Sequence, residues 1–466
     1  MGLTGVVLAA GKGTRMKSAK SKVCHHVLGR AMISRTVEQL LHTNPEQIII
    51  VVGANSSSAP SVIETIQKDF FDNNPELKNK IFFAEQKEQL GTADAVKSAL
   101  SGKKINSAHV LVLPGDAPLI RAETLKGLVE QGLSNQITIL TGILPDPTGF
   151  GRIIRSESGD VYSIIEEKDA DDSAKTIREV NSSIYLFERS FLETNLEKIG
   201  SQNAQNELYL TDLVKIASDQ NLKVQALTAH DFTEILGANH RGELVGLERI
   251  LKDRVIYYHL LNGVTIQDPI STEIEDTVII ESDCTIGADT RLRGATVIKS
   301  GTVIEGSTLI NDSVIESNCR IKLFSYIDSS HLKDGCIIGP FAQLRPGTML
   351  EKSVHIGNFV EVKKSHIGEG TKANHLTYLG DAEIGKNTNI GAGTITANYD
   401  GLNKHKTIIG DNVSVGSDTI FIAPVNIGSN SATGAGSVIN QEIPSGSLGI
   451  ARERQKNIAN WKKRSK

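Results

Sequence analysis

The chain of 466 residues lacks several features that mark common protein classes. Its four cysteines, Cys24, Cys284, Cys319 and Cys336, form no C-x-x-C pair, so we expect free thiols in a reducing compartment and no zinc site. With 50 basic and 54 acidic residues it has no positive excess to neutralise phosphates, which argues against a nucleic-acid partner.

Long apolar runs are also absent. No stretch approaches the roughly 18 apolar residues that span a bilayer, so we expect no membrane partner. The apolar run at residues 6–10 has no basic segment before it and no A-x-A site after it, and we interpret it as a buried strand instead of a signal peptide. We therefore expect a cytoplasmic protein.

Aromatic residues make up only 5% of the chain, whereas glycines number 42, which favours small-residue repeats over one large aromatic core. The length predicts two or three domains. In the first half, short apolar runs alternate with helical patterns, which predicts a Rossmann-like α/β domain with a mostly parallel sheet. The expected strands are residues 5–10, 48–53, 81–84 and 110–113, and the expected helices are 34–42, 61–71 and 92–100.

A six-residue repeat dominates the second half. Its first series of aliphatic residues is Ile274, Ile280, Ile286, Leu292, Ile298, Ile304 and Ile310. A period of six fits neither a single strand nor an α-helix, but it fits a left-handed parallel β-helix of hexapeptide repeats. Residues 397–407 interrupt the repeat, and such excursions from a scaffold are usually functional. We predict an α/β domain at 1–241, a linker helix at 242–262, a β-helix at 263–450 and a tail at 451–466.

A glycine-rich string, L-A-A-G-K-G-T-R-M-K, occupies residues 8–17 directly after the first expected strand. Gly11 and Gly13 would let backbone N–H groups approach an anion closely. Arg15 and Lys22 would supply the positive charge that a phosphoryl transition state requires. The spacing is neither that of a P-loop nor G-x-G-x-x-G, and a glycine-rich string alone could be a simple turn.

Later segments extend this pattern. They read Q-K-E-Q-L-G-T-A at 86–93, L-P-G-D-A-P-L at 113–119, P-T-G-F-G-R-I at 147–153, I-I-E-E-K-D at 164–169, E-V-N-S-S-I at 179–184 and G-A-N-H-R at 237–241. In this order the segments resemble the signatures of sugar-nucleotide pyrophosphorylases. The resemblance implies that Arg15 and Lys22 act in catalysis, and that Asp116 and Asn239 hold Mg²⁺, for which oxygen ligands are suited. It also implies a binding site for UTP and UDP-N-acetylglucosamine made of Leu8, Ala9, Ala10, Gly11, Gly13, Lys22, Gln86, Gly91, Thr92, Gly115, Asp116, Gly151, Glu166, Asn181 and Asn239.

The β-helix carries a second set of motifs, A-N-H-L-T-Y-L-G-D at 373–381 and N-I-G-A-G-T-I-T-A-N-Y-D-G at 389–401. With these, the resemblance narrows to the bacterial bifunctional N-acetylglucosamine-1-phosphate uridylyltransferases and glucosamine-1-phosphate acetyltransferases, over essentially the whole chain. It implies that His375 is a general base, a role suited to imidazole near neutral pH. It further implies that Arg345, Lys363, Tyr378 and Asn389 bind glucosamine 1-phosphate, and that acetyl-CoA is bound by Ala392, Asn398, Tyr399, Ser417, Ala435 and Arg452. The family is trimeric, so a homotrimer is expected.

Three positions depart from the family pattern. Ser21 stands where a proline usually precedes the lysine, Asp94 stands where histidine is common, and Ser182-Ser183 replaces Thr-Gly. We expect the first to loosen the placement of Lys22 and the last to affect sugar selectivity.

Two alternative functions remain open at this point. One is a single-activity sugar-1-phosphate nucleotidyltransferase whose β-helix serves only assembly or regulation. The other is a binding scaffold with decayed sites, which the presence of every named catalytic residue disfavours. The run from His375 to Tyr399 distinguishes the bifunctional enzyme, because a purely structural coil has no need of it.

Overall fold

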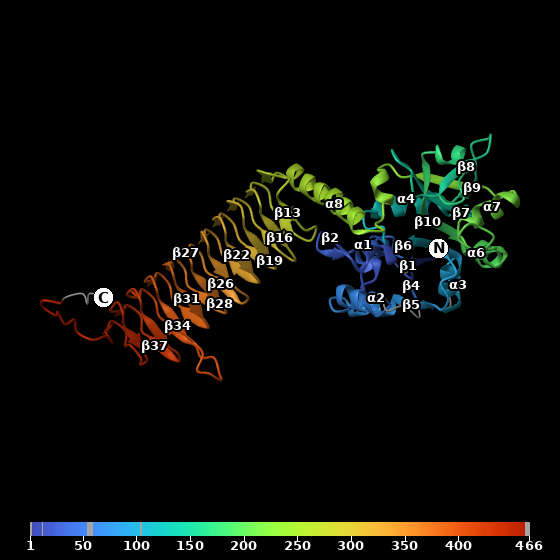
Figure 1. Ribbon diagram of the computed structural model, residues 1–466. Coiled ribbons are helices and arrows are strands. Elements are labelled where there is room, and N and C mark those ends of the chain that lie inside the picture. The colour runs from blue at the N-terminus through green and yellow to red at the C-terminus, as the bar shows by residue number, and fades with distance from the viewer. Residues whose placement is uncertain (1, 12, 54–58, 103–104, 462–466) are drawn as a thin grey trace. The chain divides into compact units, whose positions relative to one another are not determined.

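The computed structural model describes residues 2–11, 13–53, 59–102 and 105–461 (Figure 1). The chain divides into two compact units, at residues 1–251 and 252–466. The division falls inside helix α8 (Arg241–Leu261). The domain boundaries predicted from the sequence, which assign residues 242–262 to a linker helix, stay a prediction.

The first unit is built on one mixed sheet with strand order β11-β7-β10-β6-β1-β4-β5. β10 runs antiparallel to both its neighbours, whereas the other pairs along this path are parallel. β8 and β9 extend from β10 as an antiparallel pair. The strands are β1 (Leu3–Leu8), β4 (Gln47–Gly53), β5 (Ile81–Gln86), β6 (His109–Pro114), β7 (Ile137–Ile143), β8 (Arg152–Arg155), β9 (Val161–Ile165), β10 (Glu179–Glu188) and β11 (Val224–Thr228), with a small hairpin of β2 (His26–Val27) and β3 (Arg30–Ala31).

Helices cover both faces of this sheet, because its strands are apolar on both sides. On β1, Val7 points into the core under α1, α2 and α4, whereas Val6 points into the core under α3, α6 and α7. The predicted α/β class with a mostly parallel sheet is therefore confirmed. The helices are α1 (Met32–Leu41), α2 (Ala59–Ile66), α3 (Thr92–Gly102), α4 (Ala122–Gly132), α5 (Asp172–Lys175), α6 (Arg189–Asn195) and α7 (Asp212–Asp219), with shorter turns η1 (Thr14–Met16), η2 (Lys22–Cys24), η3 (Gln67–Phe71), η4 (Pro75–Asn79), η5 (Leu196–Lys198) and η6 (Phe232–Ile235).

The second unit is a stack of coils with three parallel sheets, consistent with the predicted left-handed β-helix (Figure 1). Every axial aliphatic residue of the first repeat series is buried. One sheet contains β12 (Thr265–Ile266), β15 (Thr285–Ile286), β18 (Val303–Ile304), β21 (Arg320–Ile321), β24 (Ile337–Ile338), β27 (His355–Asn358), β30 (Lys372–His375) and β33 (Asn389–Ile390). The next contains β13 (Glu273–Ile274), β16 (Arg291–Arg293), β19 (Leu309–Asn311), β22 (Tyr326–Asp328), β25 (Gln343–Leu344), β28 (Glu361–Lys363), β31 (Tyr378–Gly380), β34 (Ile395–Ala397), β36 (Ile420–Ile422) and β39 (Val438–Ile439). The third contains β14 (Ile279–Ile280), β17 (Val297–Ile298), β20 (Val314–Ile315), β23 (Ser330–Leu332), β26 (Thr348–Leu350), β29 (His366–Ile367), β32 (Ala382–Ile384), β35 (Thr407–Ile409) and β37 (Val425–Ile427), and β38 (Ala432–Thr433) pairs with β40 (Leu448–Gly449).

The slips in the repeat correspond to shorter coils. Ile274 pairs with Leu292, whereas Ile298 pairs with Ile315, so the coil loses one residue where the register slips. The one long excursion leaves the coil between β34 and β35, as the interrupted repeat predicts. All four cysteines are buried and in no disulfide. Of the helices in the described part of the chain, none has the length and apolar character needed to cross a membrane.

Candidate active sites

The glycine-rich segment follows β1 and lines a cavity of about 340 Å³ in the first unit. The predicted nucleotide-binding residues that converge on this cavity are Leu8, Ala9, Ala10, Gly11, Lys22, Gln86, Gly91, Thr92 and Asp116. Gly13 and Gly115 do not line it, and instead permit close packing beside it. A Cβ atom at Gly115 would lie 3.0 Å from the Leu8 carbonyl oxygen, and one at Gly13 would lie 2.8 Å from the Lys22 Cβ.

The side chain of Gln86 is buried and its orientation is determined by neighbours. Its Nε2 donates hydrogen bonds to the Gly91 carbonyl oxygen (3.1 Å) and to Asp94 Oδ2 (2.7 Å). Both amide protons are therefore used, so only Oε1 remains to contact a ligand. Asp94, the residue found where the family commonly has histidine, thus makes Gln86 a hydrogen-bond acceptor in this cavity.

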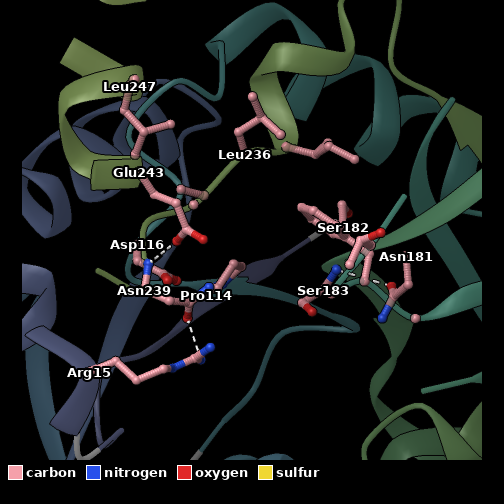
Figure 2. A pocket seen from close by; sticks show the side chains of 18 of the residues that line it. Arg15, Pro114, Asp116, Asn181, Ser182, Ser183, Leu236, Asn239, Glu243 and Leu247 are labelled. Carbon is pink, nitrogen blue, oxygen red and sulfur yellow. Dashed lines mark hydrogen bonds between the residues drawn. The ribbon is translucent and has the colours of Figure 1, made fainter. Parts of the chain in front are cut away.

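Charged groups meet where the strands β1 and β6 end (Figure 2). Lys22 Nζ lies 2.5 Å from Asp116 Oδ2 and 3.3 Å from Asn239 Oδ1. Arg15 donates to the same Asn239 oxygen at 2.9 Å (Figure 2). The Asn239 backbone N–H donates to Glu243 Oε2 at 2.6 Å. The sequence interpretation missed Glu243, although its place four residues after Asn239 in the first turn of α8 could have indicated it.

The backbone before Lys22 has the conformation that a proline would impose. Ser21 has φ −55° and ψ 142°, within the range that a proline ring imposes. Its backbone N–H donates to Ser61 Oγ at 3.3 Å, and its side chain is buried. Ser61 therefore contacts the backbone where the ring would lie, and the expectation that the missing proline loosens the placement of Lys22 stays a prediction.

A second cavity, of about 640 Å³, adjoins the first and shares Asp116 and Ser183 with it (Figure 2). Its lining includes the predicted residues Arg15, Asp116, Gly151, Glu166, Asn181 and Asn239. Burial raises the pKa of Glu166, while the Thr211 hydroxyl donates to Glu166 Oε1 at 3.2 Å. The cavity can therefore offer a carboxylate and an amide to a polar ligand, beside the charged cluster of Lys22 and Asp116.

In the second unit, the side chain of His375 is exposed at the end of β30, and its Nδ1 lies 2.8 Å from Asn358 Oδ1 at the end of β27. With the amide oxygen as acceptor, Nδ1 is the donor, and in the neutral ring Nε2 then carries the free lone pair. Asn358 was not predicted. Its position one coil before His375 is the signal that could have found it.

The predicted sugar-phosphate residues lie on the coils next to His375. Glu361 pairs with Tyr378 in the ladder between β28 and β31, and Arg345 Nη1 donates to Glu361 Oε1 at 2.6 Å. Asn389 pairs with Lys372, the first residue of the strand that ends in His375.

A cluster of like charges adjoins these residues. The ammonium of Lys404, on the excursion, lies beside Lys363 and lowers the pKa of that lysine, and Arg345 adds to the effect. Cations held close together favour binding of an anion. The sequence interpretation missed Lys404, although it lies within the excursion that was predicted to be functional.

The residues predicted to bind acetyl-CoA form a row along the later coils. The Asp418 N–H donates to the Ala392 carbonyl oxygen, and the Gly436 N–H donates to the Ser417 carbonyl oxygen, so these corners stack on successive coils. Arg452 Nη1 donates to the Ala435 carbonyl oxygen at 2.8 Å. Tyr399 is exposed on the excursion, and Asn398, which is buried, donates to Asp381 Oδ2. Ala392 lies one coil beyond His375.

Comparisons with known proteins define the class. Residues 5–154 match the family described as MobA-like NTP transferase domain, and residues 406–441 match the hexapeptide repeat of succinyl-transferase. The chain thus joins a nucleotidyltransferase domain to a hexapeptide-repeat β-helix.

Full-length relatives identify the family. The chain is 43% identical over 465 residues to the bifunctional protein GlmU of Pelobacter propionicus. This alignment covers 99% of this chain and 98% of the relative. The chain is 46% identical to the GlmU protein of Pseudomonas fluorescens over 466 residues (100% and 99%) and 45% identical to that of Streptococcus pyogenes over 461 (98% and 97%). The chain belongs to the family of bifunctional GlmU proteins. This confirms the resemblance seen in the sequence and favours the bifunctional enzyme over the single-activity alternative.

Proposed function

We propose that this chain makes UDP-N-acetylglucosamine by two reactions at two separate sites. The β-helix transfers an acetyl group from acetyl-CoA to glucosamine 1-phosphate, and the α/β unit then transfers uridylyl from UTP to the product with release of pyrophosphate. The observation that carries the proposal is that each unit of this chain assembles its own catalytic cluster, Lys22 with Asp116 and His375 with Asn358. Both co-substrates are metabolites of the cytoplasm, where we place the protein.

For the uridylyl transfer, the backbone of residues 8–11 cradles the triphosphate and the acceptor oxygen of Gln86 receives the N3–H of uracil. Arg15 and Lys22 neutralise charge that develops as the sugar phosphate oxygen attacks the α-phosphate. The oxygens of Asp116 and Asn239 both face the Lys22 ammonium, and the Asn239 oxygen also accepts from Arg15, so this donor pair also suits Mg²⁺. Bound there, Mg²⁺ would supply further charge neutralisation on the phosphates.

For the acetyl transfer, Arg345, Lys363 and Lys404 hold the phosphate of glucosamine 1-phosphate near His375. His375 Nε2 removes a proton from the 2-ammonium group, and the free amine attacks the thioester carbonyl of acetyl-CoA. The Ala392 N–H stabilises the oxyanion until the C–S bond breaks and the CoA thiolate leaves, taking up a proton. Asn358 fixes the imidazole tautomer through its 2.8 Å hydrogen bond.

An omission assay on purified protein tests the proposal. Thiol release should require only glucosamine 1-phosphate and acetyl-CoA, whereas pyrophosphate release should require those two together with UTP and Mg²⁺. N-acetylglucosamine 1-phosphate should replace the first pair. If the fully supplied protein releases neither product, the proposal is wrong.

Replacing Asn358 by alanine should lower kcat for acetyl transfer roughly tenfold, the value of one hydrogen bond that positions the base. Asn358→Asp keeps an acceptor but adds a negative charge, so it should raise the pKa of the acidic limb of the pH–rate profile. Uridylyl transfer by the same preparations is the internal control. Equal profiles for the wild type and Asn358→Asp would show that Asn358 does not act through His375.

We also propose that the chain forms a homotrimer through one edge of the β-helix. Phe324, Phe341 and Phe359 are stacked on successive coils with ring centroids 4.9 and 5.3 Å apart, yet each is about half exposed. Leu376, one coil further and next to His375, is 63% exposed. Such an apolar row is typical of an interface between subunits.

A charge in this row tests the assembly. Phe341→Glu should yield monomers by light scattering, with acetyl transfer strongly reduced and uridylyl transfer retained. Tyr326→Glu, a change at a half-exposed aromatic side chain outside the row, should leave the oligomer intact. A trimeric Phe341→Glu protein would exclude the row as the interface.

A further inference from the structure

The larger cavity of the α/β unit contains an amide whose orientation is imposed by its own strand. Asn181 lies in β10, where pairing with β7 is interrupted between Asn181 and Tyr185. Ser183, inside this irregularity, has φ 62°, a left-handed conformation that is uncommon for residues other than glycine. Asn181 and both serines after it line the cavity (Figure 2).

Two donors bind the same atom of Asn181. The Ser183 backbone N–H donates to Asn181 Oδ1 at 3.0 Å, and the Tyr185 hydroxyl donates to it at 2.9 Å. A backbone N–H can only donate, so this atom must be the amide oxygen. Both lone pairs of Oδ1 are then used, and the part of the side chain left for a ligand is the NH₂ group.

Tyr185 is well placed to hold this arrangement. Its side chain is buried, with 2% exposure, and its ring stacks on Phe187 at 5.5 Å between centroids. Burial raises the pKa of its hydroxyl far above the usual value, so the group stays protonated and able to donate. The packed ring therefore holds a protonated hydroxyl within hydrogen-bond distance of Asn181 Oδ1.

We propose that Tyr185 is a positioning residue that makes the sugar cavity select acylated amino sugars. This rests on the proposed uridylyl transfer. The NH₂ of Asn181 donates to the carbonyl oxygen of a 2-acetamido group, whereas a 2-ammonium group at the same place would face the Asn181 NH₂, which is another donor. Glucosamine 1-phosphate, the substrate of the other site, is thereby rejected until it has been acetylated.

The first test is Tyr185→Phe, which keeps the ring and removes the donor. With UTP and Mg²⁺, kcat/KM for N-acetylglucosamine 1-phosphate should fall about fivefold, the loss expected for one hydrogen bond. With glucose 1-phosphate, which has no acyl carbonyl, kcat/KM should change less than about twofold. Tyr162→Phe, at an exposed tyrosine of β9, is the matched control and should change neither value.

The second test reverses the polarity of the group. In Asn181→Asp, the Ser183 N–H and Tyr185 hydroxyl can still bind one oxygen, but the other presents an acceptor to the sugar. The preference for N-acetylglucosamine 1-phosphate over glucosamine 1-phosphate should fall at least tenfold.

The outcomes separate this inference from the function on which it rests. A wild-type protein that cannot use N-acetylglucosamine 1-phosphate with UTP would overturn the proposed function itself. If the wild type is active but Tyr185→Phe lowers turnover of all sugar phosphates equally, Tyr185 is only structural. An Asn181→Asp protein that keeps the wild-type preference would show that the amide is not the selective group.

Discussion

Replacing His375 by alanine should reduce acetyl transfer by about 10²–10⁴-fold, the usual contribution of a general base. The loss follows because Nε2 is the free basic atom of a ring fixed by Asn358. Uridylyl transfer should remain within about twofold of the wild type, since every residue assigned to it lies in the other unit. Thiol release from acetyl-CoA and pyrophosphate release from UTP measure the two reactions separately.

A histidine on the neighbouring coils provides the matched control. His366 is exposed and its Nε2 lies 3.0 Å from Glu351 Oε1, so His366→Ala removes an imidazole with a polar partner from the same β-helix. Both activities should survive that change. If His375→Ala abolishes both reactions in a protein that remains folded, the assignment of two independent sites is wrong.

The β-helix was predictable because the aliphatic residues that recur every six positions are the ones that are buried along its axis. Axial residues such as Ile286 and Ile298 are fully buried, so aliphatic side chains predominate at these positions. Strand ends in the α/β unit were less predictable. The first strand was expected to reach Ala10 but ends at Leu8. Ala9 and Ala10 are buried and line the nucleotide cavity, although the Ala9 N–H still donates to the Val51 carbonyl oxygen of β4.

Positioning residues were the part of the sites that motifs did not reveal. Asn358 lies one coil before His375, and Lys404 lies on the excursion that returns to Lys363. Neither residue belongs to a short sequence motif that contains its partner. Tyr185 follows Asn181 by four residues in a strand whose pairing with β7 is interrupted between them. The regular alternation of side chains along a strand would therefore not predict the hydrogen bond from the Tyr185 hydroxyl to Asn181. Such contacts depend on backbone geometry that a linear pattern does not contain.

Replacing Asp116 by alanine should have the opposite effect to the change at His375. Asp116 Oδ2 is the closest partner of Lys22 Nζ, at 2.5 Å, and is one of the two oxygens suited to Mg²⁺. Removing Asp116 leaves the Lys22 ammonium without its carboxylate partner and takes away one oxygen suited to bind Mg²⁺. Pyrophosphate release should therefore fall at least about 10²-fold. Acetyl transfer should be unchanged. Asp219→Ala, at an exposed carboxylate that pairs with Lys215, is the control and should affect neither reaction.

Asp116→Asn distinguishes the two roles of the carboxylate. The amide retains an oxygen donor but no charge, and Asn239 still offers its own oxygen. If Asp116 binds the metal, this variant should bind Mg²⁺ more weakly in calorimetry with UTP present, and high Mg²⁺ should restore part of the rate. If Asp116 serves only to hold Lys22, Mg²⁺ affinity should equal that of the wild type and no concentration should rescue turnover. The metal titration therefore decides between coordination and ion pairing, which the loss of activity alone would not separate.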